Sequence, residues 1–329
     1  MQQEYERHFA AKSSVRAIKS SLKQNLASHE LIACFDLQQV LYCPLTNIGD
    51  VFYKRLFSSY NLTVYDVGEK KGYCFFWPED QARRGASEIS SCVSSFLNKC
   101  MELGKTVIYL FSDSTSSQNR NTAVVAMLAA MMWFEGSLQR VRLHFFEKYH
   151  GQNEGDSVHS VIEQAKKRAG EILNPSQFVT MIRMAKQQNP YVVYELNYQS
   201  FYDFGAAADS LGIKGAKQTF TADGEQGPPM NWNHVRVVEA RRENKGELFV
   251  KFDYQADFLR LPVRRKRGRQ SDNFQLQKMY SKPVGIDGNK KKDLLSLFDR
   301  VIRNENDKAF YSNLLVAGQI NESSGTESE

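Results

Sequence analysis

The sequence predicts an α/β protein in which a mixed five-stranded sheet is flanked by helices. Its 329 residues are 42% hydrophobic and 24% charged, a balance typical of chains that fold around a core. Apolar runs of strand length and segments with helical spacing follow one another between residues 31 and 170. Strand-like runs come first, and helices and strands then alternate. This order predicts an antiparallel meander that continues into a parallel half of the same sheet.

The strands of this core are predicted from short apolar runs bounded by turn residues. The turn residues GEKKG separate the second run from the third and predict an antiparallel pair. The fourth run is apolar almost throughout, as in a strand that is buried on both faces. The five expected strands are residues 31–40, 53–67, 72–79, 106–113 and 140–150.

Three helices are expected between and after these strands. The helix at 85–104 has apolar residues at helical spacing and ends at Gly104. The helix at 119–136 is apolar nearly all round, which predicts that it is buried. The helix at 155–170 begins near Asp156, which suits an N-cap or a first turn. This succession is that of the ribonuclease H fold, in which the first and fourth strands are neighbours.

The regions outside this core have a different character. Residues 1–28 are expected to form a basic helical segment that starts in mid-pattern, as though the chain were the end part of something longer. After the core at 29–173, an α+β extension at 174–262 carries a plausible hairpin around RENKG and forms either a small barrel or an elaboration of the core. A basic segment with an amphipathic helix (263–317) and a disordered acidic tail (318–329) complete the chain.

Composition excludes several classes of protein. No apolar run reaches the roughly 18 residues needed to cross a membrane, and the charged N-terminus lacks a signal core, so we expect an intracellular protein. The five cysteines form no CxxC pair, which argues against zinc modules and disulfide frameworks and favours reduced core residues. No GxxxxGK[ST] phosphate loop occurs, which argues against an ATPase or kinase.

The distribution of positive charge predicts a nucleic-acid partner. The net charge is +6, and four consecutive basic residues form one cluster, with NKKKD further along the chain. Such clusters contact phosphates or act as nuclear-import signals, so we expect DNA as a partner and the nucleus as the location. A solvated charged loop is the alternative. The cluster consists of Arg264, Arg265, Lys266 and Arg267.

Acidic residues recur at the ends of the core elements. Asp36 lies on the first strand, Asp113 just after the fourth, and Asp156 at the start of the third helix. Glu88 lies in the first turns of the first helix. Because clustered carboxylates repel one another, such a group is most credible where divalent cations neutralise it. We expect these four residues to bind two Mg²⁺ or Mn²⁺ ions that promote phosphodiester cleavage. Structural roles in caps and turns are the alternative for each acid.

Further candidates flank these acids. His159 and Glu163 lie three and seven residues after Asp156, so all three share one helix face, and either acid could be the third catalytic carboxylate. His159 could position water, transfer a proton or only hydrogen-bond an acid. The loop residues Gln118, Asn119 and Arg120 precede a helix and could contact a nucleic-acid strand or merely cap that helix.

Four motifs carry a resemblance to a known family. FDLQQ, RRGASEISSC, FSDSTSSQNRN and HGQNEGDSVHSVIE, in this order, resemble a transposase-derived animal family with a ribonuclease H-like core, over roughly residues 5–264. The resemblance implies that Asp36, Asp113 and either Asp156 or Glu163 correspond to the DDE/D acids of transposases and integrases, with Glu88 resembling the helix-borne glutamate of ribonuclease H. It implies a nuclease or DNA strand transferase, with a homodimer as a further expectation. A domesticated, non-catalytic DNA-binding or scaffold protein is the alternative.

Overall fold

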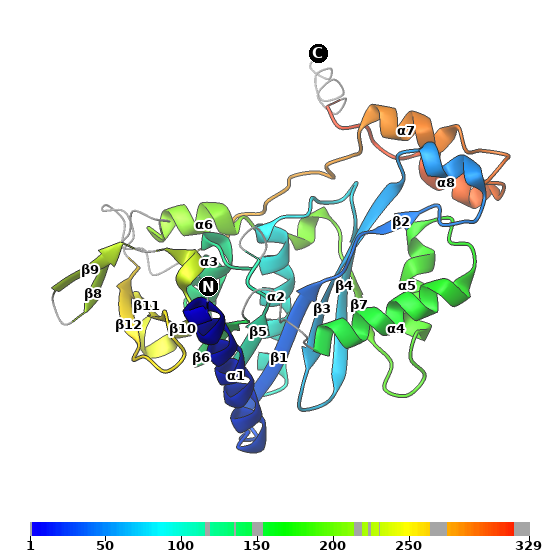
Figure 1. Cartoon of the computed structure of the whole chain (residues 1–329). Coiled ribbons are helices and arrows are strands. Elements are labelled where there is room, and N and C mark those ends of the chain that lie inside the picture. Colours follow the sequence, from blue (N-terminus) through cyan, green and yellow to red (C-terminus); the bar gives the residue numbers. More distant parts are fainter. Residues whose placement is uncertain are drawn as a thin grey trace, which may run out of the picture.

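The computed structural model describes residues 2–115, 119–134, 136–146, 154–213, 219–222, 225–229, 231–263 and 275–318, with side chains from residue 13 onward except between 214 and 230. Twelve strands in this part of the chain form one mixed sheet with helices on both faces (Figure 1), which confirms the α/β class. In chain order the strands are β1 (Glu30–Leu37), β2 (Leu41–Cys43), β3 (Phe57–Asp66), β4 (Lys71–Pro78), β5 (Val107–Ser112), β6 (Arg140–Phe145), β7 (Val192–Glu195), β8 (Thr219–Ala222), β9 (Glu225–Pro229), β10 (Val237–Arg241), β11 (Glu247–Lys251) and β12 (Leu259–Pro262).

The helices occupy the two faces of this sheet. Asn121 begins one of them as its N-cap, because its side chain accepts hydrogen bonds from the backbone N–H groups of Ala123 and Val124. The helices are α1 (Gln2–Gln24), α2 (Ala86–Glu102), α3 (Thr122–Met131), α4 (Glu154–Ala169), α5 (Pro175–Met184), α6 (Phe204–Ser210), α7 (Gly288–Leu295) and α8 (Glu305–Ser312).

The centre of the sheet has the predicted arrangement. Strand β1 lies between β3, to which it is antiparallel, and β5, to which it is parallel. Strand β4 continues the antiparallel meander beyond β3, and β6 continues the parallel half beyond β5. The expected adjacency of the first and fourth core strands, β1 and β5, is therefore confirmed.

The sheet does not stop after these five strands, so the expected five-stranded sheet is too small. Its order is β7-β4-β3-β1-β5-β6-β10-β11-β12-β8-β9, with β2 paired to β3 off this path. Strand β10 pairs with β6 and forms the predicted hairpin with β11. The extension therefore continues the core sheet. Both edges of the five-stranded core would otherwise present unpaired backbone groups, and β7 and β10 cover them.

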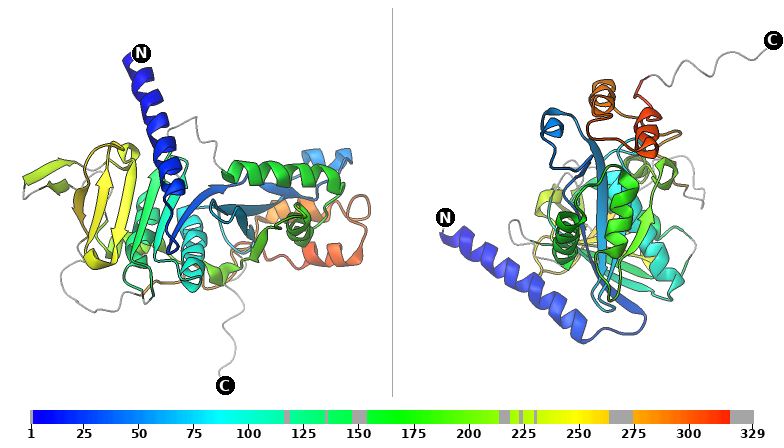
Figure 2. Two further views of the ribbon diagram at one scale, coloured as in Figure 1. Left: turned by 90° about the horizontal axis from the view of Figure 1, so that it is seen from below. Right: turned by 90° about the vertical axis from the view of Figure 1, so that its right-hand side faces the viewer.

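The two faces of β1 point into different parts of the core because its side chains alternate. Leu31, Ala33 and Phe35 pack with residues of α2 and α3. Ile32 and Cys34 point to the opposite face, where they pack with residues of α1. Helix α4 packs on this second face, against β1 and β3, and Figure 2 shows α1 and α4 on one side of the sheet and α2 on the other. Asp36 follows the alternation onto the face of α1 and α4.

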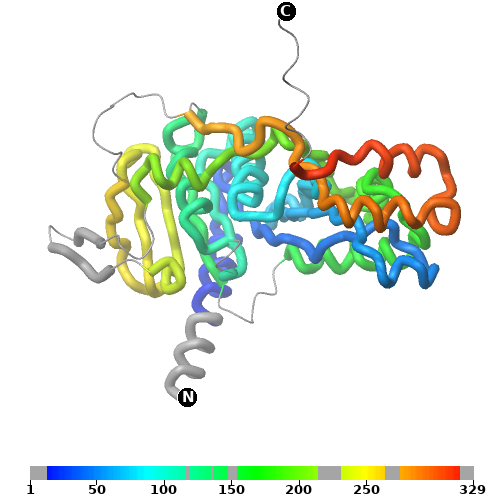
Figure 3. The backbone as a smooth tube through the Cα atoms, turned by 90° about the horizontal axis from the view of Figure 1, so that it is seen from above, coloured from blue at the N-terminus to red at the C-terminus, as the bar shows by residue number. Residues whose placement is uncertain are grey.

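The end of the chain corrects another expectation. The single amphipathic helix predicted after the basic segment is divided into α7 and α8. Asp299 adopts a φ of 65°, which a helix cannot continue through, and Asn304 then caps α8. Both helices pack with α5 and β2, at the end of the molecule away from β11 and β12 (Figures 1 and 3).

Two further predictions concern cysteines and membranes. All five cysteines are buried and none forms a disulfide, as predicted for reduced core residues. Among the described residues, no helix has the length and apolar character that spanning a membrane requires. The predicted basic cluster Arg264–Arg267 and the acidic tail lie outside the described residues, apart from Gly318.

Candidate metal centre

The site forms where β1 and β5 end side by side. In the parallel register of these strands, Phe35 pairs with Ser112, so the next residues, Asp36 and Asp113, emerge at the same end of neighbouring strands. The Asp113 carboxylate is close enough to raise the pKa of Asp36. Two acids that are far apart in the sequence are thus neighbours, as the strand order predicted.

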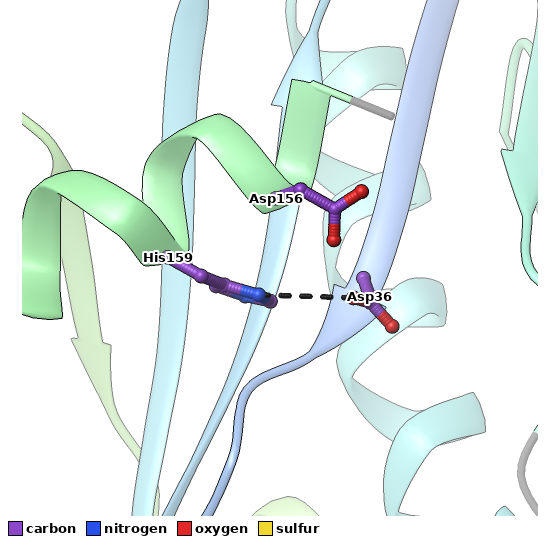
Figure 4. A group of neighbouring side chains, drawn as sticks. All are labelled: Asp36, Asp156 and His159. Carbon is purple, nitrogen blue, oxygen red and sulfur yellow. Dashed lines mark ion pairs between the residues drawn. The ribbon is translucent and has the colours of Figure 1, made fainter. Parts of the chain in front are cut away.

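Helix α4 brings the remaining ligands to Asp36. It crosses the same face of the sheet and carries Asp156 in its first turn and His159 one turn later (Figure 4). One potential ligand atom from each of Asp36, Asp156 and His159 lies within 4.8 Å of the other two. His159 Nδ1 lies 3.7 Å from Asp36 Oδ2. The i, i+3 spacing on α4 accounts for this convergence, because it places both side chains on one helix face.

Asp36 is held in an environment that disfavours its charge. Burial raises the pKa of its carboxyl group to about 7, with further contributions from the Asp113 and Asp156 carboxylates. A hydrogen bond of 2.9 Å from the Leu37 backbone N–H to Oδ1, and the positive charge of Arg84, oppose this shift only in part. The protein therefore keeps a carboxyl group where a cation would relieve the repulsion.

His159 presents a neutral imidazole to this group. Burial lowers the pKa of His159 to about 4, although Glu163 acts in the opposite direction. Its Nε2 atom is buried and has no hydrogen-bond partner in the part of the chain that the structure describes. A neutral imidazole with an available nitrogen is the form that binds a metal ion.

Asp113 is engaged by its own loop. Thr115 Oγ1 donates to Asp113 Oδ2 at 2.5 Å, and Asn119 Nδ2 donates to Oδ1. Asp113 is accordingly next to the three converging residues and outside their 4.8 Å group. The loop thus fixes the direction of this carboxylate before any cation or substrate is bound.

Asn119 and Arg120, which were expected to contact nucleic acid, are both buried. Asn119 is 1% exposed and Arg120 3% exposed. Arg120 Nη1 donates to the Asn233 carbonyl at 2.5 Å, and its guanidinium lies 4.9 Å from the centre of the Phe145 ring. Both side chains are thus buried parts of the loop. Gln118, like Arg264, Arg265, Lys266 and Arg267, lies outside the described residues.

The third acid of the group is Asp156. The other candidate, Glu163, accepts a hydrogen bond of 3.2 Å from Gln38 Nε2 and forms an ion pair of 2.5 Å with Lys166. Gln38 is itself held by a hydrogen bond from Asn61. These contacts engage the Glu163 carboxylate with Gln38 and Lys166, whereas Asp156 is the acid on α4 that converges with Asp36 and His159.

Glu88 is not brought into this group. Its helix, α2, packs on the face of the sheet opposite to Asp36, and the Glu88 side chain is 1% exposed there. Its Oε1 atom accepts a hydrogen bond from the Tyr280 hydroxyl. The expectation that Glu88 is a metal ligand is therefore not supported by its position, and its contacts are those of a buried structural carboxylate.

Sequence reasoning missed a second polar contact beside the centre. The Lys19 ammonium of α1 lies between Cys34 and Glu154, with 2.9 Å to Cys34 Sγ and an ion pair to Glu154. Burial would lower the pKa of Lys19, but these two partners outweigh it and hold the pKa above its ordinary value. The available signal was that Cys34 and Asp36 alternate onto one face of the first strand.

Comparisons of the chain with protein-family profiles, with curated proteins and with solved structures found no match. The group consists of two carboxylates and one neutral imidazole whose nearest oxygen and nitrogen atoms lie within 4.8 Å of one another, with the Asp113 carboxylate beside them.

Proposed function

We propose that this protein is a divalent-metal-dependent enzyme that cleaves phosphodiesters, a nuclease or DNA strand transferase with a ribonuclease H-like core. The order β4-β3-β1-β5-β6 within the larger sheet supports the proposal, since it combines a meander with a parallel half around β1. The resemblance of the four motifs to transposase-derived proteins supports DNA as the substrate and the nucleus as the location.

The observation that carries the proposal is the convergence of Asp36, Asp156 and His159. Isolated acids on a surface are common and indicate little. Here a largely buried carboxyl group has its pKa raised to about 7 by burial and by two neighbouring acids, and a neutral imidazole lies 3.7 Å from it. Such an arrangement is costly for the apo protein, and a bound cation removes that cost.

The two carboxylates and the imidazole suit a divalent cation of the first transition row, such as Mn²⁺, better than they suit Mg²⁺. Carboxylate oxygens suit both Mg²⁺ and Mn²⁺, whereas an imidazole nitrogen favours Mn²⁺ over Mg²⁺. Asp36 and Asp156 would hold the ion with His159, and Asp113 lies where it would share a second ion with Asp36. When bound, such ions activate the attacking oxygen and stabilise the leaving oxygen of a phosphodiester.

The surrounding residues prepare these ligands. Asp36 is oriented by the Leu37 N–H, and Asp113 by Thr115 and Asn119, so neither carboxylate has to be reoriented when substrate arrives. Burial keeps His159 neutral at physiological pH, which makes its nitrogen available as a ligand. Ligands that are fixed in advance bind metal more tightly than mobile ones.

The test is cleavage of labelled duplex and single-stranded DNA in Mn²⁺, in Mg²⁺ and in EDTA. We expect metal-dependent cleavage by the wild type and a loss of at least about a thousandfold in Asp36→Asn and Asp156→Asn, as for other residues that hold the catalytic charge. The matched control is Asp257→Asn, which removes an exposed carboxylate and is expected to retain full activity.

A non-catalytic DNA-binding protein is the competing proposal. The position of Asp113 favours it, because this carboxylate lies outside the group in which Asp36, Asp156 and His159 converge. DNA binding that falls steeply with salt, without cleavage in any of the metal solutions, would establish this second function in place of the first.

A further inference from the structure

An open cavity of about 420 Å³ lies between α1 and the first turn of α4, on the face of the sheet that carries the metal centre. Figure 2 shows the two helices on this side of the sheet. The volume is within the usual range for pockets that bind small ligands or parts of larger ones. The lining side chains that carry polar groups are Arg16, Lys19, Ser20, Lys23, Glu154 and Ser157.

One face of α1 supplies the basic side of the cavity. Arg16, Ser20 and Lys23 are exposed and lie at i, i+4 and i+7, so they form one row along the helix. The apolar residues Val15 and Ile18 pack instead against the sheet and hold the helix in place. Arg16, Ser20 and Lys23 therefore face the cavity, because the opposite side of α1 packs on the sheet.

The charges of the cavity do not cancel. Lys19 is 14% exposed and its charge is matched by Glu154, with which it forms an ion pair. Neither Arg16 nor Lys23 forms an ion pair with any residue in the described ranges. The lining consequently keeps two positive charges without counterions among the described side chains, together with the hydroxyl groups of Ser20 and Ser157.

The cavity lies next to the metal centre, as short separations along both β1 and α4 show. Cys34, which contacts Lys19, lies two residues before Asp36 on the same face of β1, a separation of about 7 Å at ~3.3 Å per residue. On α4, Ser157 of the cavity follows Asp156 of the centre directly. A phosphate bound in the cavity would thus lie close enough to Asp36 and Asp156 for a neighbouring phosphodiester of the same strand to reach them.

We propose that this cavity binds a backbone phosphate of a nucleic-acid strand and thereby positions the neighbouring phosphodiester at the metal centre. The inference rests on the proposed function for its choice of ligand. Arg16 offers a planar guanidinium that matches two phosphate oxygens, Lys23 offers a mobile ammonium, and the serine hydroxyls offer further donors. Glu154 does not repel the phosphate because Lys19 neutralises it.

The test is DNA binding by the full-length chain, measured by fluorescence anisotropy with a labelled DNA duplex and with its single strand over a series of KCl concentrations in EDTA. The variant is Arg16→Gln with Lys23→Gln, which removes both unpaired charges from exposed positions. The control is Lys167→Gln with Arg303→Gln, which removes the same charge from exposed positions in the last turn of α4 and just before α8.

We expect weaker binding by the cavity variant. Because one phosphate contact is lost, the slope of log K against log salt should be shallower by about 0.9 for duplex or about 0.7 for single strand. The control should keep the wild-type slope. An equal change in both variants, an unchanged slope in the cavity variant, or no DNA binding by the wild type would overturn the proposal.

Because EDTA prevents metal-dependent cleavage, this measurement separates the cavity from the catalytic proposal. Salt-dependent binding that is lost in the cavity variant, with no cleavage by the wild type, would keep the phosphate site and reject the enzyme. Cleavage by the wild type that the cavity variant retains with unchanged KM would reject the phosphate site and keep the enzyme.

Discussion

His159 Nδ1 and Asp36 Oδ2 lie 3.7 Å apart, where a strand end meets the side of a helix, and their pKa values are shifted in opposite directions. With the ordinary pKa values of 3.8 and 6.5, the two groups would form an ion pair between these two pH values. Burial instead raises the pKa of Asp36 to about 7 and lowers that of His159 to about 4. Between these values the imidazole is neutral and the carboxyl group holds its proton, so the contact is prepared for a cation and is not a stabilising salt bridge.

Asp36→Asn should stabilise the metal-free protein at alkaline pH. The folded state holds a proton on Asp36 up to about pH 7, whereas the unfolded chain loses it near the ordinary value of 3.8, so wild-type stability falls as pH rises between these values. Asp36→Asn cannot lose a proton at this position, so its stability should not fall in this way. Its free energy of unfolding should match that of the wild type at pH 4 and exceed it by up to about 4 kcal/mol above pH 7. Urea denaturation in EDTA measures both values.

A control variant and a comparison between two pH values test whether the stabilisation comes from the charge of Asp36. Asp257→Asn, at an exposed position, should leave the free energy of unfolding unchanged at every pH. A difference between Asp36→Asn and the wild type that is equally large at pH 4 and pH 8 would mean that the effect comes from packing and that the Asp36 carboxyl group is not strained by its charge.

His159→Asn should change the acid side of the stability profile. The folded-state pKa of about 4 is below the ordinary value of 6.5, so the unfolded chain binds the proton first and wild-type stability falls as pH drops through this interval. The variant should lose less stability than the wild type between pH 7 and pH 4, measured by urea denaturation. His29→Asn, at an exposed position, should follow the wild-type profile, and parallel profiles for all three proteins would contradict the assignment of a neutral His159.

Asp156→Asn and Glu163→Gln should differ in their effect on metal binding. Asp156 converges with Asp36 and His159, whereas Glu163 is held by Gln38 and Lys166. In calorimetric titrations with Mn²⁺, we expect Asp156→Asn to weaken binding by about a hundredfold or more, and Glu163→Gln by less than about tenfold, as for a residue outside the coordination sphere. The opposite ranking would make Glu163 the third ligand.

The central fold could be predicted because its signals are local. Apolar runs bounded by turn residues predicted β1, β3, β4, β5 and β6, and the meander before the first helix predicted which of them are neighbours. The pairing of β10 with β6 could not be predicted in this way, since strands distant in sequence leave no local trace of their partner. The break between α7 and α8 contains Asp299, whose positive φ no periodicity reveals.

In the site, too, local relationships could be predicted from the sequence, and contacts between distant segments could not. The spacing of Asp156 and His159 predicted that they share a helix face, and the strand order predicted that Asp36 and Asp113 are neighbours. Position along the chain could not reveal on which side of the sheet α2 packs, and so it could not reveal that Glu88 lies outside the group of Asp36, Asp156 and His159. Lys19 was missed because its partners, Cys34 and Glu154, come from two other elements.

Glu88 and Tyr280 supply the last prediction, which separates a structural carboxylate from a catalytic one. The Tyr280 hydroxyl donates to Glu88 Oε1 and accepts from the Arg83 backbone N–H at 3.2 Å. Tyr280→Phe leaves both groups without this partner, so the free energy of unfolding should fall by about 1–3 kcal/mol, measured by urea denaturation. Tyr53→Phe, at a tyrosine that is 87% exposed, should have no effect.

The Mn²⁺ affinities of Glu88→Gln and Tyr280→Phe then show whether Glu88 is a metal ligand. Because Glu88 lies on the face of the sheet opposite to Asp36, Glu88→Gln and Tyr280→Phe should bind Mn²⁺ with wild-type affinity at temperatures where both remain folded. A loss of affinity comparable to that in Asp156→Asn would place Glu88 among the ligands. Unchanged affinity with reduced stability would show that its carboxylate, although buried at a helix start as in a catalytic site, serves the fold alone.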